Sequence, residues 1–189
     1  MSHHHTEPVL ILLPPSEKKS EKPGPAIQVY AGVLYAALGW EQLTVAQRKK
    51  GAESVAIISA KYGVLRPLDP IEPYKEKIEN KKIAAQVSQA LDGLESELII
   101  DCRSSTYQTV WKSPVEITVE IKVFTKIEGI KKVITHMSKK TRGEVTQHIL
   151  KSSKVPANPL ELQAVVAEKF ECHLLERSKK DPWVLEVYC

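Results

Sequence analysis

Three short apolar runs constrain the fold of this chain more than any other feature of its sequence. They are VLILL at residues 9–13, VAII at residues 55–58 and LIID at residues 98–101. Each run has the length of a buried strand and leads into a proline-rich or polar segment. Segments with helical periodicity separate the runs. This interleaving predicts an α/β or α+β fold, a single domain over residues 1–189 with a mixed β-sheet core surrounded by helices.

The spacing of apolar residues places the other elements. A helix is expected from Ile27, because positions 30, 33, 34, 37 and 38 follow a helix face that ends near Gly39. Further helices are expected over 45–53 with Thr44 as N-cap, over 79–94, from Ser104 or Ser105, from Ser138 or Thr141 through 150, and over 159–170. Alternation over residues 115–123 predicts a half-exposed strand at the sheet periphery, followed by a hairpin turn at residues 128–129. Residues 171–177 and 183–189 predict a final pair of strands.

The composition is that of a soluble globular protein, with 42% hydrophobic and 26% charged residues. No apolar run is long enough to cross a bilayer or has the pattern of a signal peptide, so we expect a cytoplasmic protein without a membrane partner. Cys102, Cys172 and Cys189 are odd in number and widely spaced, as expected of free thiols. We expect residues 1–7, which contain three histidines, to be a disordered tail, and we expect no metal or cofactor.

Four polar segments follow strands and carry the candidate chemistry. They span residues 14–19, 59–74, 101–107 and 135–144. Loops at the carboxyl ends of parallel strands meet at one crevice, so we expect these segments to converge. Cations, hydroxyls and aromatic rings together suit a phosphate-bearing ligand, DNA or a nucleotide. The candidate binding residues are Ser16, Lys18, Lys19, Lys61, Tyr62, Arg66, Arg103, Ser104, Ser105, Tyr107, Lys139, Lys140 and Arg142.

Two other interpretations of these segments stay open. An enzyme acting on a nucleotide or on a base in nucleic acid would use carboxylates, a lysine or a tyrosine as acid, base or nucleophile. The candidates for such roles are Glu17, Lys61, Asp69, Tyr74 and Asp101. The same residues also have structural interpretations: Arg66 and Asp69 as a local brace, Tyr62 and Tyr74 as aromatics over the core, and Asp101 as a helix cap.

Several stretches resemble, in order, the YaaA family of bacterial peroxide-stress proteins. YGVLRPLDPIEPY at residues 62–74 is similar to the family's most recognisable segment, and PPSEKK at residues 14–19 is similar to its opening PPSEGK. VYAGVLYAALG, IIDCRSSTYQTVW and VITHMSKKTRGEVTQHIL resemble a helix, a strand with its following loop, and a basic segment before a helix. The chain is shorter than the family between residues 19 and 29 and again after residue 74.

The resemblance implies one compact domain with a positively charged cleft. It also implies a cytoplasmic protein that binds DNA and limits oxidative damage under peroxide, partly by lowering free iron. It implies no established catalytic mechanism, and the oligomeric state stays open. A scaffold or partner protein without a ligand of its own is a third possibility.

Overall fold

The computed structural model describes residues 8–77 and 79–189, so the expected tail at residues 1–7 lies outside the described residues. An eight-stranded sheet runs in the order β4-β3-β1-β6-β7-β10-β9, with β8 paired to β7, and β2 pairs with β5 separately. The strands are β1 Val9–Leu13, β2 Gly24–Pro25, β3 Val55–Ser59, β4 Gly63–Leu65, β5 Pro70–Ile71, β6 Leu98–Asp101, β7 Thr118–Ile127, β8 Ile130–Lys132, β9 Glu171–Leu175 and β10 Trp183–Tyr188. The helices are α1 Ala26–Val29, α2 Val33–Leu38, the 3₁₀ helix η1 Trp40–Gln42, α3 Val45–Ser54, α4 Asn80–Leu91, α5 Ser105–Gln108, α6 Thr135–Lys151 and α7 Pro159–Ala167.

The three apolar runs form strands, as predicted, and the structure places these strands next to one another and parallel. β1 pairs with β3 on one side and with β6 on the other. Alternate residues of β1 enter different cores: Val9 and Ile11 contribute to one hydrophobic cluster, and Leu10 and Leu12 to the other. A run that is apolar at every position is therefore required, because both faces of this strand are covered.

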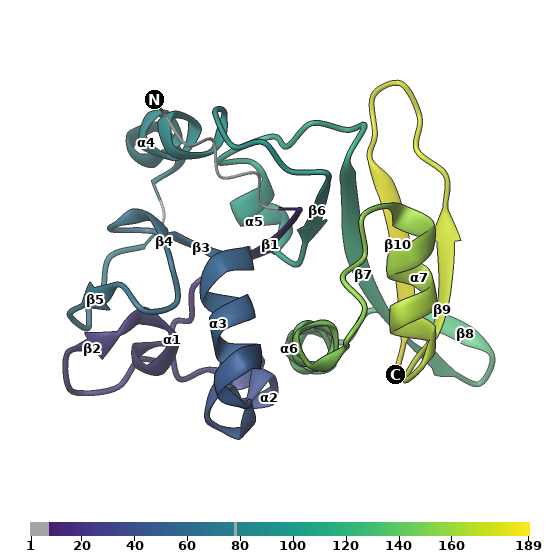
Figure 1. Cartoon of the computed structure of the whole chain (residues 1–189), viewed down its shortest axis with the longest axis horizontal. Coiled ribbons are helices and arrows are strands. Elements are labelled where there is room, and N and C mark those ends of the chain that lie inside the picture. The colour runs from purple at the N-terminus through teal and green to yellow at the C-terminus, as the bar shows by residue number, and fades with distance from the viewer. Residues whose placement is uncertain (1–7, 78) are drawn as a thin grey trace.

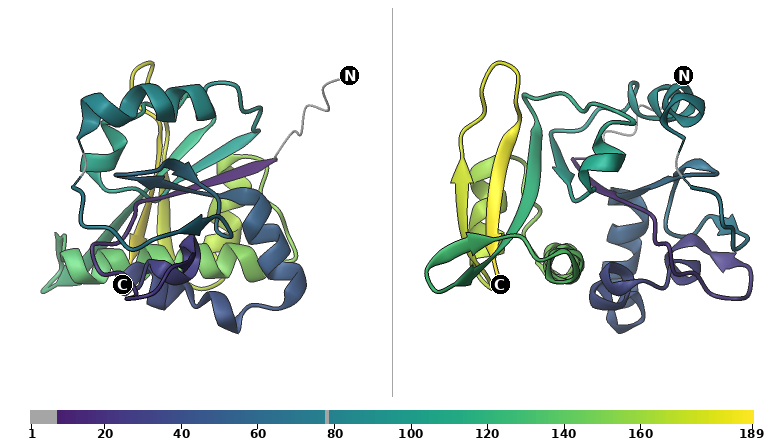
Figure 2. Two further views of the ribbon diagram at one scale, coloured as in Figure 1. Left: turned by 90° about the vertical axis from the view of Figure 1, so that its left-hand side faces the viewer. Right: turned by 180° about the vertical axis from the view of Figure 1, so that it is seen from behind.

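Helices cover the two faces of the sheet to different extents. In the left view of Figure 2, α4 lies above the sheet, whereas α2, α3 and α6 lie below it. The larger core joins these lower helices and α7 to one face of the strands from β3 to β10. The smaller core joins α4 to the opposite face of β1, β3 and β6. Figure 1 shows α6 end-on between α3 and the β7–β10 side of the sheet.

Helix capping follows the sequence closely at several ends. Thr44 forms a capping box with Gln47 at the start of α3, and the Asn158 side chain accepts from the Glu161 amide at the start of α7. Gly39 ends α2 in the left-handed conformation, with φ 58°. These predicted ends are confirmed.

Three predicted elements differ from the structure. The helix expected from residue 27 is two short helices, because Tyr30 forms a β-bridge with Lys19 between them. The strand β7 is not peripheral, because it pairs with β6 and β10. Its alternation arises because Val119, Ile121 and Val123 enter the larger core, whereas Lys122 on the other face is exposed. The prediction that a helix begins at Ser138 or Thr141 is wrong, since α6 begins at Thr135.

The α6 helix packs closely on α2. A Cβ atom at Gly143 would lie 2.1 Å from the backbone oxygen of Leu34 and 3.0 Å from the Cβ of Ala37. The Gln147 side chain donates to the Leu38 carbonyl at 3.0 Å. Gly143 therefore sets the distance between the two helices. Although α6 has 17 residues, no helix in the described part of the chain is long and apolar enough to cross a membrane.

Candidate functional site

The carboxyl ends of β1, β3 and β6 lie at one edge of the sheet, because the three strands are parallel. The segments at residues 14–19, 60–62 and 102–107 start at this edge. The segment at residues 72–74 reaches the same place, since the Glu72 amide donates to the Tyr62 hydroxyl at 3.3 Å. Three of the four polar segments are thus brought together.

Tyrosines form the centre of this region. The Tyr74 hydroxyl lies 2.7 Å from the Tyr30 hydroxyl and 2.9 Å from the Ser59 hydroxyl, so one hydrogen-bonded chain links three buried side chains. The Tyr62 ring packs edge-on against the Tyr74 ring, with centroids 5.6 Å apart. Burial raises the pKa of Tyr107 to about 12, with smaller contributions from nearby Tyr74 and Glu17. Tyr107 therefore belongs to the same group of rings.

Two lysines lie over these rings. The Lys19 Nζ atom is 4.1 Å from the Tyr74 ring centroid and 5.8 Å from that of Tyr30. The Lys61 Nζ atom is 6.0 Å from the Tyr74 centroid and 5.5 Å from that of Tyr62. Both ammonium groups are therefore within cation–π range of one ring. We call Lys19, Lys61 and the tyrosines 30, 62, 74 and 107 the lysine–tyrosine cluster.

The electrostatics of the two lysines differ. Burial lowers the pKa of Lys19, although the carboxylates of Glu17 and Glu76 act in the opposite direction. Exposed Lys61 is paired with Glu76 at 3.4 Å, and this hydrogen bond raises the pKa of Lys61. The ammonium of Lys19 is thus the less well compensated of the two positive charges.

Residues 14–20 are held against the α1–α2 region. The Tyr35 hydroxyl donates to the Pro14 carbonyl at 2.6 Å, and the Ala31 amide donates to the Lys18 carbonyl at 2.9 Å. A Cβ at Gly32 would lie 2.1 Å from the Ser16 hydroxyl, so only glycine lets Ser16 occupy this place. These contacts fix Ser16 and Lys19 at the sheet edge, while the side chains of Glu17 and Lys18 are exposed.

Arg103 and Asp101 form a buried ion pair beneath this region. Their side chains are 1% and 2% exposed, and the Arg103 Nη2 to Asp101 Oδ2 distance is 2.8 Å. Arg103 also donates to the carbonyls of Tyr107 and Trp111 at 3.1 and 3.0 Å. Every guanidinium nitrogen of Arg103 thus has a partner within the protein, so this arginine braces the loop that carries Tyr107. The helix α5 after Ser104 has only four residues, and Ser104 makes no side-chain cap bond.

The other predicted residues lie apart from the cluster. Arg66 donates to the carbonyls of Glu53 and Val55, at the amino end of β3. The Asp69 carboxylate accepts from the Arg66 amide at 2.7 Å, which closes a turn. This geometry agrees with the bracing interpretation of both residues.

The basic segment on α6 is also separate. Lys139 and Lys140 are exposed in the second turn of the helix, and Lys140 pairs with Glu144 at 3.8 Å. Arg142 donates to the Ile121 carbonyl at 3.4 Å. Within residues 8–77 and 79–189 no hydrogen bond, ion pair or ring contact joins these three residues to the lysine–tyrosine cluster.

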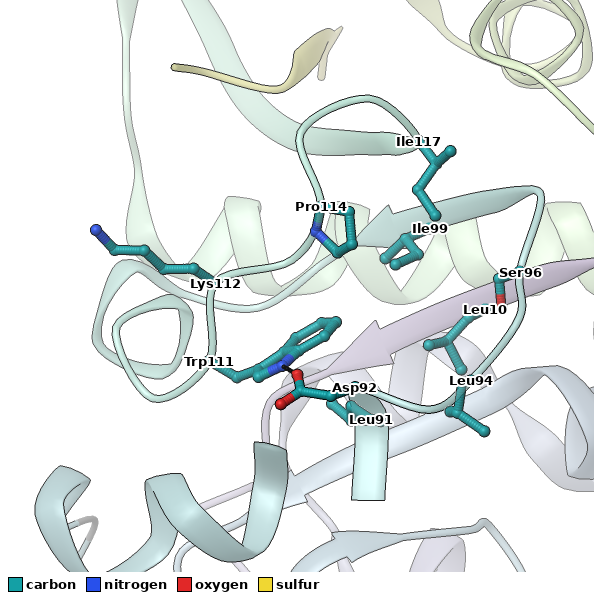
Figure 3. Close-up of a pocket in the computed structure, with 10 residues that line it drawn as sticks. All are labelled: Leu10, Leu91, Asp92, Leu94, Ser96, Ile99, Trp111, Lys112, Pro114 and Ile117. Atoms are coloured by element: carbon teal, nitrogen blue, oxygen red, sulfur yellow. Dashed lines mark hydrogen bonds between the residues drawn. The ribbon is translucent and has the colours of Figure 1, made fainter. Parts of the chain in front are cut away.

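A pocket of about 200 Å³ lies elsewhere, at the amino ends of the strands (Figure 3). It is lined largely by apolar side chains, including Leu10, Leu94 and Ile117, and by Trp111, whose indole N–H donates to Asp92 at 2.7 Å. Lys112 is the one cationic residue in its lining, so the pocket is poorly suited to phosphate. The polar chemistry is at the opposite edge of the sheet.

Sequence reasoning missed four residues of this region: Tyr30, Tyr35, Ser59 and Glu76. Tyr30 falls on the predicted helix face and Tyr35 lies within the same predicted helix, where a tyrosine is indistinguishable from an ordinary core residue. Ser59 could have been identified from the sequence as a site residue, because it is the first polar residue after the apolar run at residues 55–58.

Fold and site together define a class of protein: an α/β protein that presents lysines and tyrosines at the carboxyl edge of parallel strands. The sequence model of one family, described as peroxide stress protein YaaA, matches residues 13–174. The matched range includes the whole lysine–tyrosine cluster. The chain belongs to this family.

Individual relatives carry the name UPF0246. The UPF0246 protein of Streptomyces coelicolor is 27% identical over 176 residues, which cover 86% of this chain and 68% of the relative. Those of Corynebacterium efficiens and Corynebacterium glutamicum are 35% and 31% identical over 69% and 75% of this chain. The aligned regions span 56% and 60% of these two relatives, so this chain corresponds to little more than half of each.

Proposed function

We propose that this protein is a cytoplasmic peroxide-stress protein that binds DNA or a nucleotide through the lysine–tyrosine cluster. The observation that carries the proposal is the position of Lys19 and Lys61, whose ammonium groups both lie within about 6 Å of the Tyr74 ring centroid. Two cations beside one ring repel each other. An anionic phosphate between them would offset this repulsion and replace the solvation that Lys19 loses by burial.

The aromatic rings supply the second half of the interaction. Tyr62 and Tyr107 are half-buried, whereas Tyr30 and Tyr74 are buried. A base that lies beside a phosphate held by the lysines could stack on one of the two accessible rings. The same group of residues therefore suits both parts of a nucleotide, and the exposed side chain of Lys18 is available for a further phosphate.

The test is equilibrium binding of fluorescently labelled single-stranded and duplex oligonucleotides across a salt series. We expect binding that weakens steeply with salt, and we expect Lys19→Gln and Lys61→Gln each to reduce the salt slope by about 0.7–0.9. Lys169→Gln is the matched control, since Lys169 lies 5.3 Å from the Phe170 ring on another part of the surface. Absence of binding at low salt, or binding that salt does not change, would refute the proposal.

The lowered pKa of Lys19 favours a second candidate, an enzyme that acts on a nucleotide or on a base in nucleic acid. A lysine whose pKa is lowered loses its proton more readily and can act as nucleophile or base, and the hydrogen-bonded hydroxyls of Tyr30, Ser59 and Tyr74 can relay a proton beside it. Glu17 is exposed near the same rings, whereas Asp69 and Asp101 are engaged in structural contacts.

Incubation with nucleotides and damaged oligonucleotides, followed by mass spectrometry, tests this candidate. We expect a product with the unmodified protein and none with Lys19→Gln. An unchanged set of substrates leaves ligand binding as the function of the cluster.

A further inference from the structure

The hairpin formed by β7 and β8, with the two residues after it, has an apolar surface that is exposed among the described residues. Ile127, Ile130, Val133 and Ile134 are 38%, 59%, 67% and 37% exposed. They are four of the nine large hydrophobic residues exposed in the described part of the chain, and they occur within eight positions. Single exposed hydrophobic residues are ordinary, but a group of this kind marks a contact surface.

The tip of the hairpin is held in a defined shape. Ile127 and Ile130 are directly opposite each other in the β7–β8 pairing. The two residues between them, Glu128 and Gly129, have φ values of 52° and 76°. Two successive left-handed residues are typical of the tight two-residue turn that fits the twist of a hairpin. The two isoleucines thus form a small apolar tip with little conformational freedom to lose on binding.

Lysines and arginines are concentrated in the sequence around this tip. Residues 125–142 carry six lysines and arginines against one glutamate, so their formal charge of +5 exceeds the +4 of the whole chain. Lys126 and Lys131 fold back and pair with Glu171 and Glu186. Lys132 and Lys139 are exposed and have no ion pair among the described residues. An apolar tip inside a basic rim is complementary to a partner with negative charge and flat apolar groups.

The hairpin also projects in a relevant direction. β7 runs parallel to β6, so the hairpin extends beyond the same edge of the sheet at which the lysine–tyrosine cluster lies. In the left view of Figure 2 it leaves the molecule beside the start of α6. A strand of nucleic acid held at the cluster would pass along the edge toward the hairpin.

We propose that the β7–β8 hairpin is a wedge that inserts Ile127 and Ile130 between bases of a nucleic acid, while Lys132 and Lys139 contact its phosphates. This inference rests on the function proposed for the lysine–tyrosine cluster. Apolar side chains on other proteins separate stacked bases in this way and bend the nucleic acid. Both nucleic acid and an anionic membrane carry phosphates, but nucleic acid is favoured because it alone also has flat bases between which the tip can insert.

The experiment uses oligonucleotides with 2-aminopurine, whose fluorescence rises when it is unstacked. We expect the unmodified protein to raise this fluorescence, and Ile130→Ser to abolish the rise and weaken binding about fivefold or more. Leu160→Ser is the matched control, since Leu160 on α7 is 69% exposed and lies outside the basic segment. Circular dichroism should show Ile130→Ser to be folded, because a side chain that is 59% exposed contributes little to the core.

The outcomes separate the two proposals. If Lys19→Gln weakens salt-dependent binding while Ile130→Ser behaves as the unmodified protein, the wedge is refuted and the cluster stands. If the unmodified protein binds no oligonucleotide at low salt, both fail. The wedge is also refuted if Ile130→Ser abolishes binding to phosphatidylserine vesicles or self-association on size exclusion while leaving the fluorescence rise intact.

Discussion

Replacing Arg103 by methionine should destabilise the fold without removing a ligand contact. Arg103→Met deletes a guanidinium that is 1% exposed and leaves the Asp101 carboxylate buried without its cation. It also removes the donors to the carbonyls of Tyr107 and Trp111. Breaking one side of a buried ion pair costs about 3–5 kcal/mol, because the remaining charge is left uncompensated.

This cost is a large part of the total stability, which for a domain is about 5–15 kcal/mol. With a urea dependence of about 2 kcal/mol per M, a loss of 4 kcal/mol lowers the unfolding midpoint by about 2 M. Equilibrium unfolding in urea, followed by circular dichroism, measures this shift. The salt slope of oligonucleotide binding, measured on the folded fraction, should equal that of the unmodified protein, because Lys19 and Lys61 are unchanged.

A double variant tests the assigned cause. Asp101→Asn combined with Arg103→Met removes both charges of the buried pair, so its loss of stability should be smaller than the sum of the two single losses. The reasoning is refuted if Arg103→Met keeps its urea midpoint within about 0.5 M of the unmodified protein. It is also refuted if the salt slope of oligonucleotide binding falls by about 0.7–0.9, because Arg103 would then contact a phosphate.

Two further predictions concern the helix contact and the thiols. Gly143→Ala should cost about 1–3 kcal/mol of unfolding free energy in the same urea assay, because the new Cβ would lie 2.1 Å from the Leu34 oxygen. Gly93→Ala, with no atom within 4 Å of its Cβ, is the control and should change stability by less than about 0.5 kcal/mol. Burial raises the pKa of Cys102 to about 12, so near pH 8 its thiolate fraction is on the order of one in ten thousand. Iodoacetamide at pH 8 should therefore modify exposed Cys189 in the folded protein and Cys102 only after denaturation. Peptide mass mapping identifies the modified cysteines. Rapid labelling of Cys102 in the native state would contradict its buried position.

The sequence predicted the elements whose pattern depends on local burial. The three apolar runs became β1, β3 and β6, and the capping residues Thr44 and Asn158 begin α3 and α7. In each case the signal lies within a few residues of the element that it defines. Helix and strand periodicity therefore sufficed for the order of the main elements and for the mixed sheet.

Contacts between distant segments account for the errors. The helix expected across residues 27–38 is interrupted because Tyr30 pairs with Lys19, a partner eleven positions away that periodicity cannot detect. The start of α6 was expected too late, because the apolar residues before Thr135 are exposed and resemble a continued strand. The periodicity of apolar residues cannot show which segments, distant along the chain, contact each other in the folded protein.

The same limit explains why a list of cations in polar loops does not define a ligand site. Lys19, Arg66 and Arg103 all follow strands in the sequence, yet Arg66 binds carbonyls at the far end of β3 and Arg103 is enclosed with Asp101. A buried cation with a full set of internal acceptors has no capacity for a phosphate, whereas a partly buried ammonium over an aromatic ring does. The burial of each cation and the number of its hydrogen-bond partners within the protein, rather than its charge, show which of these residues can bind a phosphate. By that criterion the binding proposal depends on Lys19 and Lys61. Substitution of Arg103 tests the complementary claim, that this arginine stabilises the fold and does not bind the ligand.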